Sequence, residues 1–300
     1  MVNNMKYLVT GVSGQLGYDV VKELQKRGHE ALGTTHSTMD ISNLSNVLQV
    51  VNNYKPDVII NCAAYTKVDN AEQDEDNCFK SNSIAALNMV IAASNVDAKL
   101  FYISSDYVFD GSKPLDIMYT TEDQVNPLNV YGKSKEYGEK YTSEYPKHFI
   151  VRTSWVFGIN GNNFVKTMLK LGEKYDKITV VNDQVGSPTY TPDLAKLLVD
   201  MSETDRYGTY HGTNTGFVSW ADFAKDIFEV NGKNVEVIPV TTEEFYNGKP
   251  HAERPMNSKL SKMKLTLNGF EELPSYRDAL VRYKTELSKA KVLELKKDQQ

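Results

Sequence analysis

The 300-residue chain lacks the features that mark secreted, membrane and nucleic-acid-binding proteins. Its two cysteines, Cys62 and Cys78, are too few for a disulfide framework and form no CxxC pair typical of zinc or redox sites. Its net charge of −5 offers no positive field to nucleic acid. No apolar run approaches the ~18 to 20 residues of a membrane span, and the first residues show no signal-peptide pattern. We therefore expect a cytoplasmic protein that binds neither membranes nor nucleic acid.

Strand and helix patterns alternate through the first half of the chain. Strand-like apolar runs cover residues 5–10, 30–34, 58–61, 99–104 and 149–153. Helical spacing follows the first four of them, at residues 16–28, 44–51, 85–95 and 130–144. Several of the strand-like runs are apolar throughout, which is typical of a parallel sheet buried on both faces. We predict an α/β fold with a Rossmann-like, doubly wound parallel sheet.

The second half has shorter elements separated by glycine and proline, and it includes an amphipathic helix at 220–230. No linker separates it from the first half, which indicates two interleaved parts. We predict a dinucleotide-binding Rossmann domain at 1–154, to which part of 181–216 returns. Residues 155–285 would form a smaller α/β lobe that binds substrate. Residues 286–300 would form a charged tail, with a fraying, solvated helix from about Lys289.

A glycine cluster lies between the first strand and the first helix, at residues 11–17 (GVSGQLG). Glycines there permit a tight turn, a close approach of the backbone to a pyrophosphate and close packing of the helix, whose N-terminus favours an anion. The motif alone is weak, but its place after the first strand favours dinucleotide binding over a purely structural turn. The residues predicted to contact the cofactor in this turn are Gly11, Ser13, Gly14, Gln15 and Leu16.

The end of the second strand indicates which dinucleotide is used. An Asp or Glu there would accept hydrogen bonds from the ribose of NAD, but the stretch at 33–37 reads GTTHS. Hydroxyls and the imidazole, with Thr35 and His36 as candidates, would suit a 2′-phosphate, so we expect NADPH, with NADH as the alternative. Asp40 and Ile41 are candidates for the adenine end, although Asp40 is equally suited to cap the next helix.

A tyrosine and a lysine one helical turn apart form the candidate catalytic pair. Tyr131 and Lys135 share one face of the helix predicted at 130–144. An ammonium group near a phenol stabilises the phenolate, which makes the tyrosine a usable general acid or base. Ser104 and Ser105 end an upstream strand at the edge of the sheet where ligands bind, and a hydroxyl there would orient a carbonyl.

These motifs together resemble the extended short-chain dehydrogenase/reductase superfamily and, within it, the branch that reduces the 4-keto group of dTDP-linked sugars. The resemblance covers residues 5–285, and therefore both parts of the chain. It rests on the segments 10–17 (TGVSGQLG), 61–72 (NCAAYTKVDNAE), 104–111 (SSDYVFDG), 129–135 (NVYGKSK), 152–158 (RTSWVFG), 182–189 (NDQVGSPT) and 254–258 (RPMNS).

The resemblance implies reduction of dTDP-4-dehydro-L-rhamnose to dTDP-L-rhamnose, the last step in making the activated sugar for bacterial surface polysaccharide. Hydride would pass from the nicotinamide to C4 while Tyr131 protonates the developing alkoxide. Lys135 would bind the nicotinamide ribose and tune Tyr131. Ser105 would hydrogen-bond the carbonyl oxygen, at a position where relatives commonly carry threonine, with Ser104 as the fallback.

The resemblance also implies further contacts. For the cofactor these are Ala63, Ala64, Tyr65 and Asn82. For the substrate they are Asp106, Tyr107, Trp155, Asn163 and Arg254, in addition to Ser105. Trp155 would pack on the sugar, or serve only as a core aromatic residue. Asn163 and Arg254 would meet the nucleotide and diphosphate, or Arg254 would form a structural ion pair.

One departure from the family pattern concerns metal binding. Some similar proteins bind Mg²⁺ at a dimer interface through acidic residues, one of them in the glycine-rich turn, where this chain has Gln15. A neutral amide is a poor ligand for a hard cation, so we expect no metal and a monomer or weak homodimer.

Two other functions remain open. A nucleotide-sugar epimerase uses the same fold but retains its NAD. A regulatory protein, like a regulatory subunit of methionine adenosyltransferase, keeps the fold and binds a partner. A dehydratase would carry an Asp-Glu pair after the strand-end hydroxyl, and Ser105 is followed here by Asp106 and Tyr107. The intact hydroxyl, tyrosine and lysine favour an enzyme.

Overall fold

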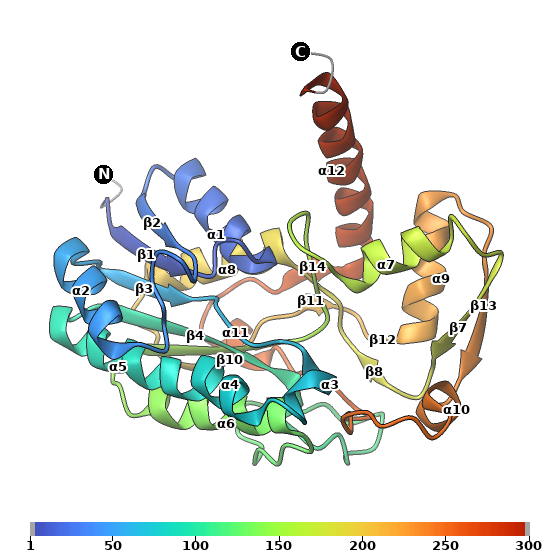
Figure 1. Ribbon diagram of the computed structural model, residues 1–300, viewed down its shortest axis with the longest axis horizontal. Helices are drawn as coiled ribbons and strands as arrows, with labels where there is room; N and C mark the ends of the chain where they lie inside the picture. Colours follow the sequence, from blue (N-terminus) through green and yellow to red (C-terminus); the bar gives the residue numbers. More distant parts are fainter. Residues whose placement is uncertain (1–3, 298–300) are drawn as a thin grey trace.

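A six-stranded sheet forms the centre of the molecule in a computed structural model, which describes residues 4–297 (Figure 1). All neighbouring strands run parallel. In spatial order the strands are β10 (Gly208–His211), β5 (His148–Thr153), β4 (Lys99–Ser105), β3 (Val58–Asn61), β1 (Lys6–Thr10) and β2 (Glu30–Thr34).

Helices cover both faces of this sheet (Figure 1). One face carries α1 (Gln15–Lys26) and α8 (Thr191–Ser202), and the other carries α2 (Leu44–Tyr54), α5 (Ala85–Val96) and α6 (Val130–Ser143). Because side chains alternate along a strand, Tyr7 and Val9 of β1 pack with α1 and α8 while Leu8 packs with α2 and α5. This double burial explains why a central strand such as β3 is almost entirely apolar, and it confirms the predicted Rossmann-like fold.

The strand order reverses next to β1. The chain passes from β1 to β2 on one side and then returns to place β3 on the other side. Crossovers in opposite directions leave a crevice outside the carboxyl ends of these strands, which is where open α/β sheets bind ligands.

The smaller lobe is built around β7 (Lys177–Val181) and β13 (Glu236–Val240), which pair in parallel beneath α7 (Phe164–Leu171) and α9 (Trp220–Asn231). Its core is rich in aromatic side chains, with Phe157, Phe223 and Phe228 among them. Three short strand pairs complete the lobe and its junction with the sheet: β6 (Val156–Phe157) with β9 (Thr189–Tyr190), β8 (Val185–Gly186) with β12 (Val218–Ser219), and β11 (Asn214–Thr215) with β14 (Leu273–Ser275).

Short helices fill the connections. They are α3 (Val68–Ala71), α4 (Glu75–Phe79), the π-helix η1 (Lys80–Ile84), the 3₁₀-helix η2 (Asp106–Val108), α10 (Thr242–Tyr246) and α11 (Met263–Leu267). In the described residues no helix is both long and apolar enough to cross a membrane.

The last helix crosses the predicted boundary between the smaller lobe and the tail. Helix α12 (Tyr276–Lys297) begins ten residues before residue 286 and rises away from the body of the molecule (Figure 1). Its first turns bury Leu280 and Tyr283 in the core of the smaller lobe, so the helix starts as a packed element. The end of the predicted tail, 298–300, lies outside the described residues, and the domain limits stay predictions.

Candidate active site

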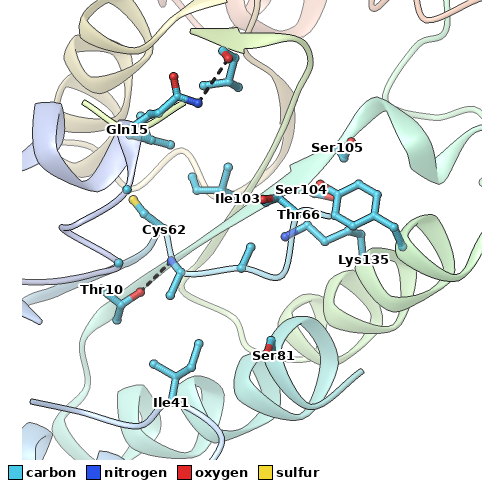
Figure 2. A pocket seen from close by; sticks show the side chains of 18 of the residues that line it. Thr10, Gln15, Ile41, Cys62, Thr66, Ser81, Ile103, Ser104, Ser105 and Lys135 are labelled. Atoms are coloured by element: carbon cyan, nitrogen blue, oxygen red, sulfur yellow. Dashed lines mark hydrogen bonds between the residues drawn. The ribbon is translucent and has the colours of Figure 1, made fainter. Parts of the chain in front are cut away.

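A cavity of about 740 Å³ opens at the carboxyl ends of β1 to β5, at the crevice that the strand order predicts. Figure 2 shows Thr10 and Gln15 on one side of it and Ser104, Ser105 and Lys135 on the other. Most of the predicted site residues line this single cavity: Gly11, Ser13, Gly14, Gln15, Leu16, Thr35, His36, Asp40, Ile41, Ala63, Ala64, Ser105, Asp106, Tyr107, Tyr131, Lys135 and Trp155.

Tyr65 and Asn82, two predicted cofactor contacts, do not line the cavity. The side chain of Asn82 accepts a hydrogen bond from the backbone N–H of Tyr65 (2.9 Å) and donates to the carbonyl of Tyr65 (3.0 Å). Asn82 also donates to the hydroxyl of Ser134 on α6 over 2.8 Å. Its polar atoms are therefore used to hold the loop after β3 against α6, and this loop carries the cavity residues Ala63 and Ala64.

Asn163 and Arg254, two predicted substrate contacts, also lie outside the cavity lining. Asn163 caps α7 by accepting from the backbone N–H of Lys166 (3.0 Å), and its amide donates to Gln15 (3.0 Å). Arg254 forms an ion pair with Asp69 at 2.8 Å, which corresponds to the structural alternative for this residue. The polar groups of both side chains thus form contacts between distant parts of the chain, Asn163 with Gln15 and Arg254 with Asp69.

The glycine turn is shaped by close backbone contacts. Gly11 has φ +66°, and a Cβ atom there would lie 2.8 Å from the backbone of Ala63, so the turn can approach the loop after β3 only with glycine. At Gly17 a Cβ atom would lie 2.5 Å from the carbonyl oxygen of Gly11. Gly14 precedes α1 and has no side chain to cap its first turn. The free N–H groups of that turn suit a pyrophosphate.

The end of β2 presents hydroxyl groups to the cavity. Thr35 and Ser37 lie side by side with their oxygens 2.9 Å apart, next to the exposed His36. The carboxylate of Asp40 already has hydrogen-bond partners within the protein. It accepts hydrogen bonds from the backbone and the hydroxyl of Ser42 (3.0 and 2.8 Å), which lower the pKa of Asp40. The hydroxyl group of Thr35 and the imidazole of His36 line the cavity here and can donate hydrogen bonds to a 2′-phosphate.

Tyr131 is positioned by the start of α6. Asn129 caps this helix by accepting from the backbone N–H of Gly132 over 2.7 Å. A Cβ atom at Gly132 would lie 2.2 Å from the carbonyl oxygen of Tyr107, so glycine lets α6 begin directly against the segment after β4. The rings of Tyr107 and Tyr131 meet edge to face at 5.6 Å. This packing holds the Tyr131 side chain in the cavity, next to the carboxyl end of β4.

The predicted catalytic groups converge. Burial raises the pKa of Tyr131, and a hydrogen bond with Ser105 lowers it in part. Lys135 is only 3% exposed, and burial lowers its pKa to about 8. The hydroxyl of Ser105 donates to Asp106 over 2.9 Å. A phenol, an adjacent hydroxyl and a buried ammonium group thus face one cavity, which is the arrangement needed to protonate a carbonyl oxygen as it is reduced.

Two buried hydroxyl groups along the cavity have no protein partner among the described residues. They are those of Ser104 and Thr153, at the ends of β4 and β5. Buried polar groups normally find a partner. These two hydroxyl groups therefore indicate a polar ligand, and with the glycine turn the residues present fit a dinucleotide beside a second molecule.

The sequence interpretation missed several cavity residues. Thr10 donates to Asn61 over 2.6 Å and accepts from the backbone N–H of Ala63 over 3.1 Å, which fixes the loop after β3. Thr153 ends β5, and Lys80 and Ser81 come from η1. The position of Thr10 and Thr153 at carboxyl ends of parallel strands was a usable signal, whereas nothing local marks the two η1 residues.

The predicted absence of a metal concerns Mg²⁺ bound by acidic residues at a dimer interface. Among residues 4–290, whose side chains the structure describes, no group of three or more His, Cys, Asp or Glu side chains could hold a metal ion. The metal-free site and the monomer or weak homodimer stay predictions.

Fold and site together define a Rossmann-fold oxidoreductase of the short-chain dehydrogenase/reductase type. The RmlD substrate binding domain family model matches residues 5–289. The spore coat polysaccharide biosynthesis protein SpsK of Bacillus subtilis (strain 168) is 39% identical over 95% of this chain and 99% of its own length. The dTDP-4-dehydrorhamnose reductase of Aggregatibacter actinomycetemcomitans is 41% identical over 87% of this chain and 92% of its own.

A solved structure agrees with these relatives. The dTDP-4-dehydrorhamnose reductase from Bacillus anthracis str. Ames, in complex with NADP, superposes with a TM-score of 0.90 at 45% identity, covering 94% of this chain and 99% of its own. The chain therefore belongs to the RmlD family of dTDP-4-dehydrorhamnose reductases, which confirms the resemblance found in its motifs.

Proposed function

We propose that the chain is an NADPH-dependent oxidoreductase that reduces the 4-keto group of dTDP-4-dehydro-L-rhamnose to dTDP-L-rhamnose for polysaccharide biosynthesis. The observation that carries this proposal is the convergence of Ser105, Tyr131 and Lys135 on one cavity with the glycine turn of a dinucleotide site. Family membership supplies the sugar, because relatives covering nearly the whole chain are reductases of dTDP-4-dehydrorhamnose.

The residues would divide the chemistry as follows. The bound nicotinamide supplies a hydride to C4 of the sugar. Ser105 donates a hydrogen bond to the carbonyl oxygen, and Tyr131 gives that oxygen its proton as the C=O bond becomes C–OH. Burial raises the pKa of Tyr131, so the phenol is protonated at neutral pH and ready to act as an acid. The nearby Lys135 cation favours the phenolate that remains, which is then reprotonated from solvent.

Other cavity residues would bind rather than react. The turn at Gly11 and Gly14 would hold the pyrophosphate, and Thr35, His36 and Ser37 would hold the 2′-phosphate of NADPH. Trp155 lines the cavity with φ +48° and stacks on Trp220 at 3.6 Å, so its outer surface is held rigidly toward the space for the sugar.

Asp106 and Tyr107 would complete the substrate pocket. Asn163 and Arg254 are not included, because their polar groups are engaged elsewhere. The cytoplasmic location predicted from the sequence stays a prediction.

The experiment that tests the proposal follows oxidation of NADPH and of NADH, side by side, with dTDP-4-dehydro-L-rhamnose. The purified protein is first checked for bound cofactor. We expect sugar-dependent oxidation, faster with NADPH, and one dTDP-L-rhamnose formed per cofactor consumed. Protein that purifies with NAD and interconverts sugars without net oxidation would instead be an epimerase. Protein that binds NADPH without turnover would be a regulatory subunit.

A further inference from the structure

A second tyrosine packs against Lys135 and does not line the cavity. Tyr102 is on β4, three residues before Ser105, and is 3% exposed. The ammonium nitrogen of Lys135 lies 4.6 Å from the centre of the Tyr102 ring. That distance is within the range of a cation–π contact, in which the negative face of the ring attracts the cation.

Tyr102 is held in place from two sides. Its hydroxyl donates to the backbone carbonyl of Asn82 over 3.0 Å. On α6, a Cβ atom at Gly138 would lie 2.1 Å from the Tyr102 hydroxyl oxygen, so glycine is what lets this helix pass over the tyrosine. Asn82 belongs to the π-helix η1, a rare geometry that frequently lies at functional sites. The ring therefore has little freedom to move away from Lys135.

The Lys135 ammonium group is in close contact with the Tyr102 ring rather than with a carboxylate. Within the described part of the chain, no carboxylate lies at salt-bridge distance from Lys135. Glu139, on the same helix, is engaged by Arg152 through two hydrogen bonds of 2.8 and 2.7 Å. Its charge still favours the Lys135 cation from further away, and burial opposes that cation.

The remaining titratable groups near Lys135 are neutral. Cys78 of α4 and Cys62 after β3 are thiols whose pKa values are raised by burial. Tyr131 on α6 and Tyr102 itself are phenols whose pKa values are raised mainly by burial. The face of the Tyr102 ring thus supplies a favourable electrostatic contact that none of these neutral groups supplies at close range.

We infer that Tyr102 is a positioning residue for catalysis, whose ring keeps the Lys135 ammonium group charged and directed into the cavity. The inference rests on the proposed function in one respect, namely that Lys135 acts on Tyr131 as a cation. It adds a residue that touches neither substrate nor cofactor and acts only through Lys135.

The test removes the negative potential on the face of the ring at position 102 while the shape of the ring is kept. Position 102 is occupied in turn by tyrosine, phenylalanine and pentafluorophenylalanine, the last of which has the shape of phenylalanine without the negative ring face. The pH profile of kcat/KM with the keto sugar and NADPH is then measured for each protein. We expect kcat/KM of Tyr102→Phe to decline at the same alkaline pH as in the wild type. In the fluorinated protein this decline should lie about one pH unit lower. Equal alkaline limbs in all three proteins would overturn the inference.

A measurement without turnover separates this inference from the proposed function. The carbon-13 chemical shift of Lys135 Cε, assigned with Lys135→Met, reports the pKa of Lys135 directly. The pKa of Lys135 is expected to fall by about one unit in the fluorinated protein and to stay at the wild-type value in Tyr102→Phe. A wild type without sugar-dependent oxidation would contradict the proposed function while the lysine titration still tests the contact. An unchanged Lys135 pKa in an active fluorinated protein would contradict the contact alone.

Discussion

The side-chain oxygen of Gln15 accepts a hydrogen bond from the backbone N–H of Gly158 over 2.9 Å. Gln15 begins α1 and Gly158 follows β6, so this bond joins the glycine turn of the sheet to the smaller lobe. The amide of Asn163 donates to the same oxygen over 3.0 Å. The cofactor turn and the start of α7 are thus fixed to each other by two uncharged side chains.

Asn163→Ala should therefore affect stability more than catalysis. It removes the cap of α7 and leaves one of the bonds to Gln15 unmade, so we expect the free energy of unfolding to fall by about 1 to 2 kcal/mol. The KM for the dTDP sugar should stay within about twofold of the wild type. Urea unfolding and steady-state kinetics provide the two numbers. Asn43→Ala, which removes a similar cap from α2, is the matched control, and a large rise in KM with unchanged stability would restore Asn163 to the substrate site.

Tyr131→Phe should fold, bind NADPH and lose turnover. Only the hydroxyl is removed, so the ring contact with Tyr107 remains while the proton donor is absent. We expect kcat to fall by about 100-fold or more, the usual contribution of a positioned general acid. Tyr137→Phe is the control on the same helix, because that side chain is 44% exposed and lies away from the cavity. Comparable loss in both variants would point to α6 as a whole instead of the Tyr131 hydroxyl.

Lys135→Met should stabilise the protein while abolishing its activity. Burial lowers the pKa of Lys135 from 10.5 to about 8, so the folded state disfavours the charged form. That cost is fully present below about pH 8 and is relieved as pH rises toward the unfolded value, so the variant should gain up to about 3 kcal/mol near pH 7 and less near pH 10. Urea unfolding at both pH values measures the gain. A variant less stable than the wild type near pH 7 would show that Lys135 is well paired in the folded state.

The sequence predicted those parts of the fold and site that depend on local pattern. The five strands of the first half were each predicted to within about two residues, because most of them carry a run of apolar residues that is buried on both faces, although β2 is mostly exposed or half-buried. Tyr131 and Lys135 are one turn apart, and Ser105 ends a strand, so their meeting follows from helix and sheet geometry. The strands of the smaller lobe such as β6 and β8 have two residues each, which is too short to show any periodicity.

The predicted substrate contacts that lie outside the cavity lining are engaged by distant segments of the chain. Arg254 lies 185 positions from Asp69, and Asn163 lies 148 positions from Gln15. A motif indicates that a guanidinium or an amide is available, but only the folded chain shows that another side chain already uses it. The Tyr102 contact with Lys135 was missed for the same reason, since an isolated tyrosine inside an apolar strand looks like core.

The buried carboxyl group of Asp106 predicts a pH effect of definite sign. Burial raises the pKa of Asp106 from 3.8 to about 6. The resulting contribution to stability is fully present below about pH 4 and is lost as pH rises through about 6. The stability of Asp106→Asn relative to the wild type should thus improve by up to about 3 kcal/mol between pH 4 and pH 7.5.

Asp110→Asn is the opposite control for that measurement. Hydrogen bonds from Ser112, Asn126 and Tyr119 outweigh the effect of burial and lower the pKa of Asp110. The Asp110 carboxylate stabilises the fold above the pKa that it has in the unfolded chain. The free energy of unfolding of Asp110→Asn should therefore fall relative to that of the wild type as pH rises. Urea unfolding at several pH values measures both variants. Parallel trends in the two would show that the environment of Asp106 does not favour its neutral form.

His36→Asp should change the choice of cofactor. His36 lies exposed at the end of β2 beside the paired hydroxyls of Thr35 and Ser37, and it lines the cavity. A carboxylate there would repel a 2′-phosphate and accept hydrogen bonds from an unmodified ribose. We expect the KM for NADPH to rise by about tenfold or more while the KM for NADH stays the same or falls. His36→Ala, which removes the imidazole without adding charge, should change the ratio less. An equal rise in both KM values for His36→Asp would contradict the placement of the 2′-phosphate at this strand end.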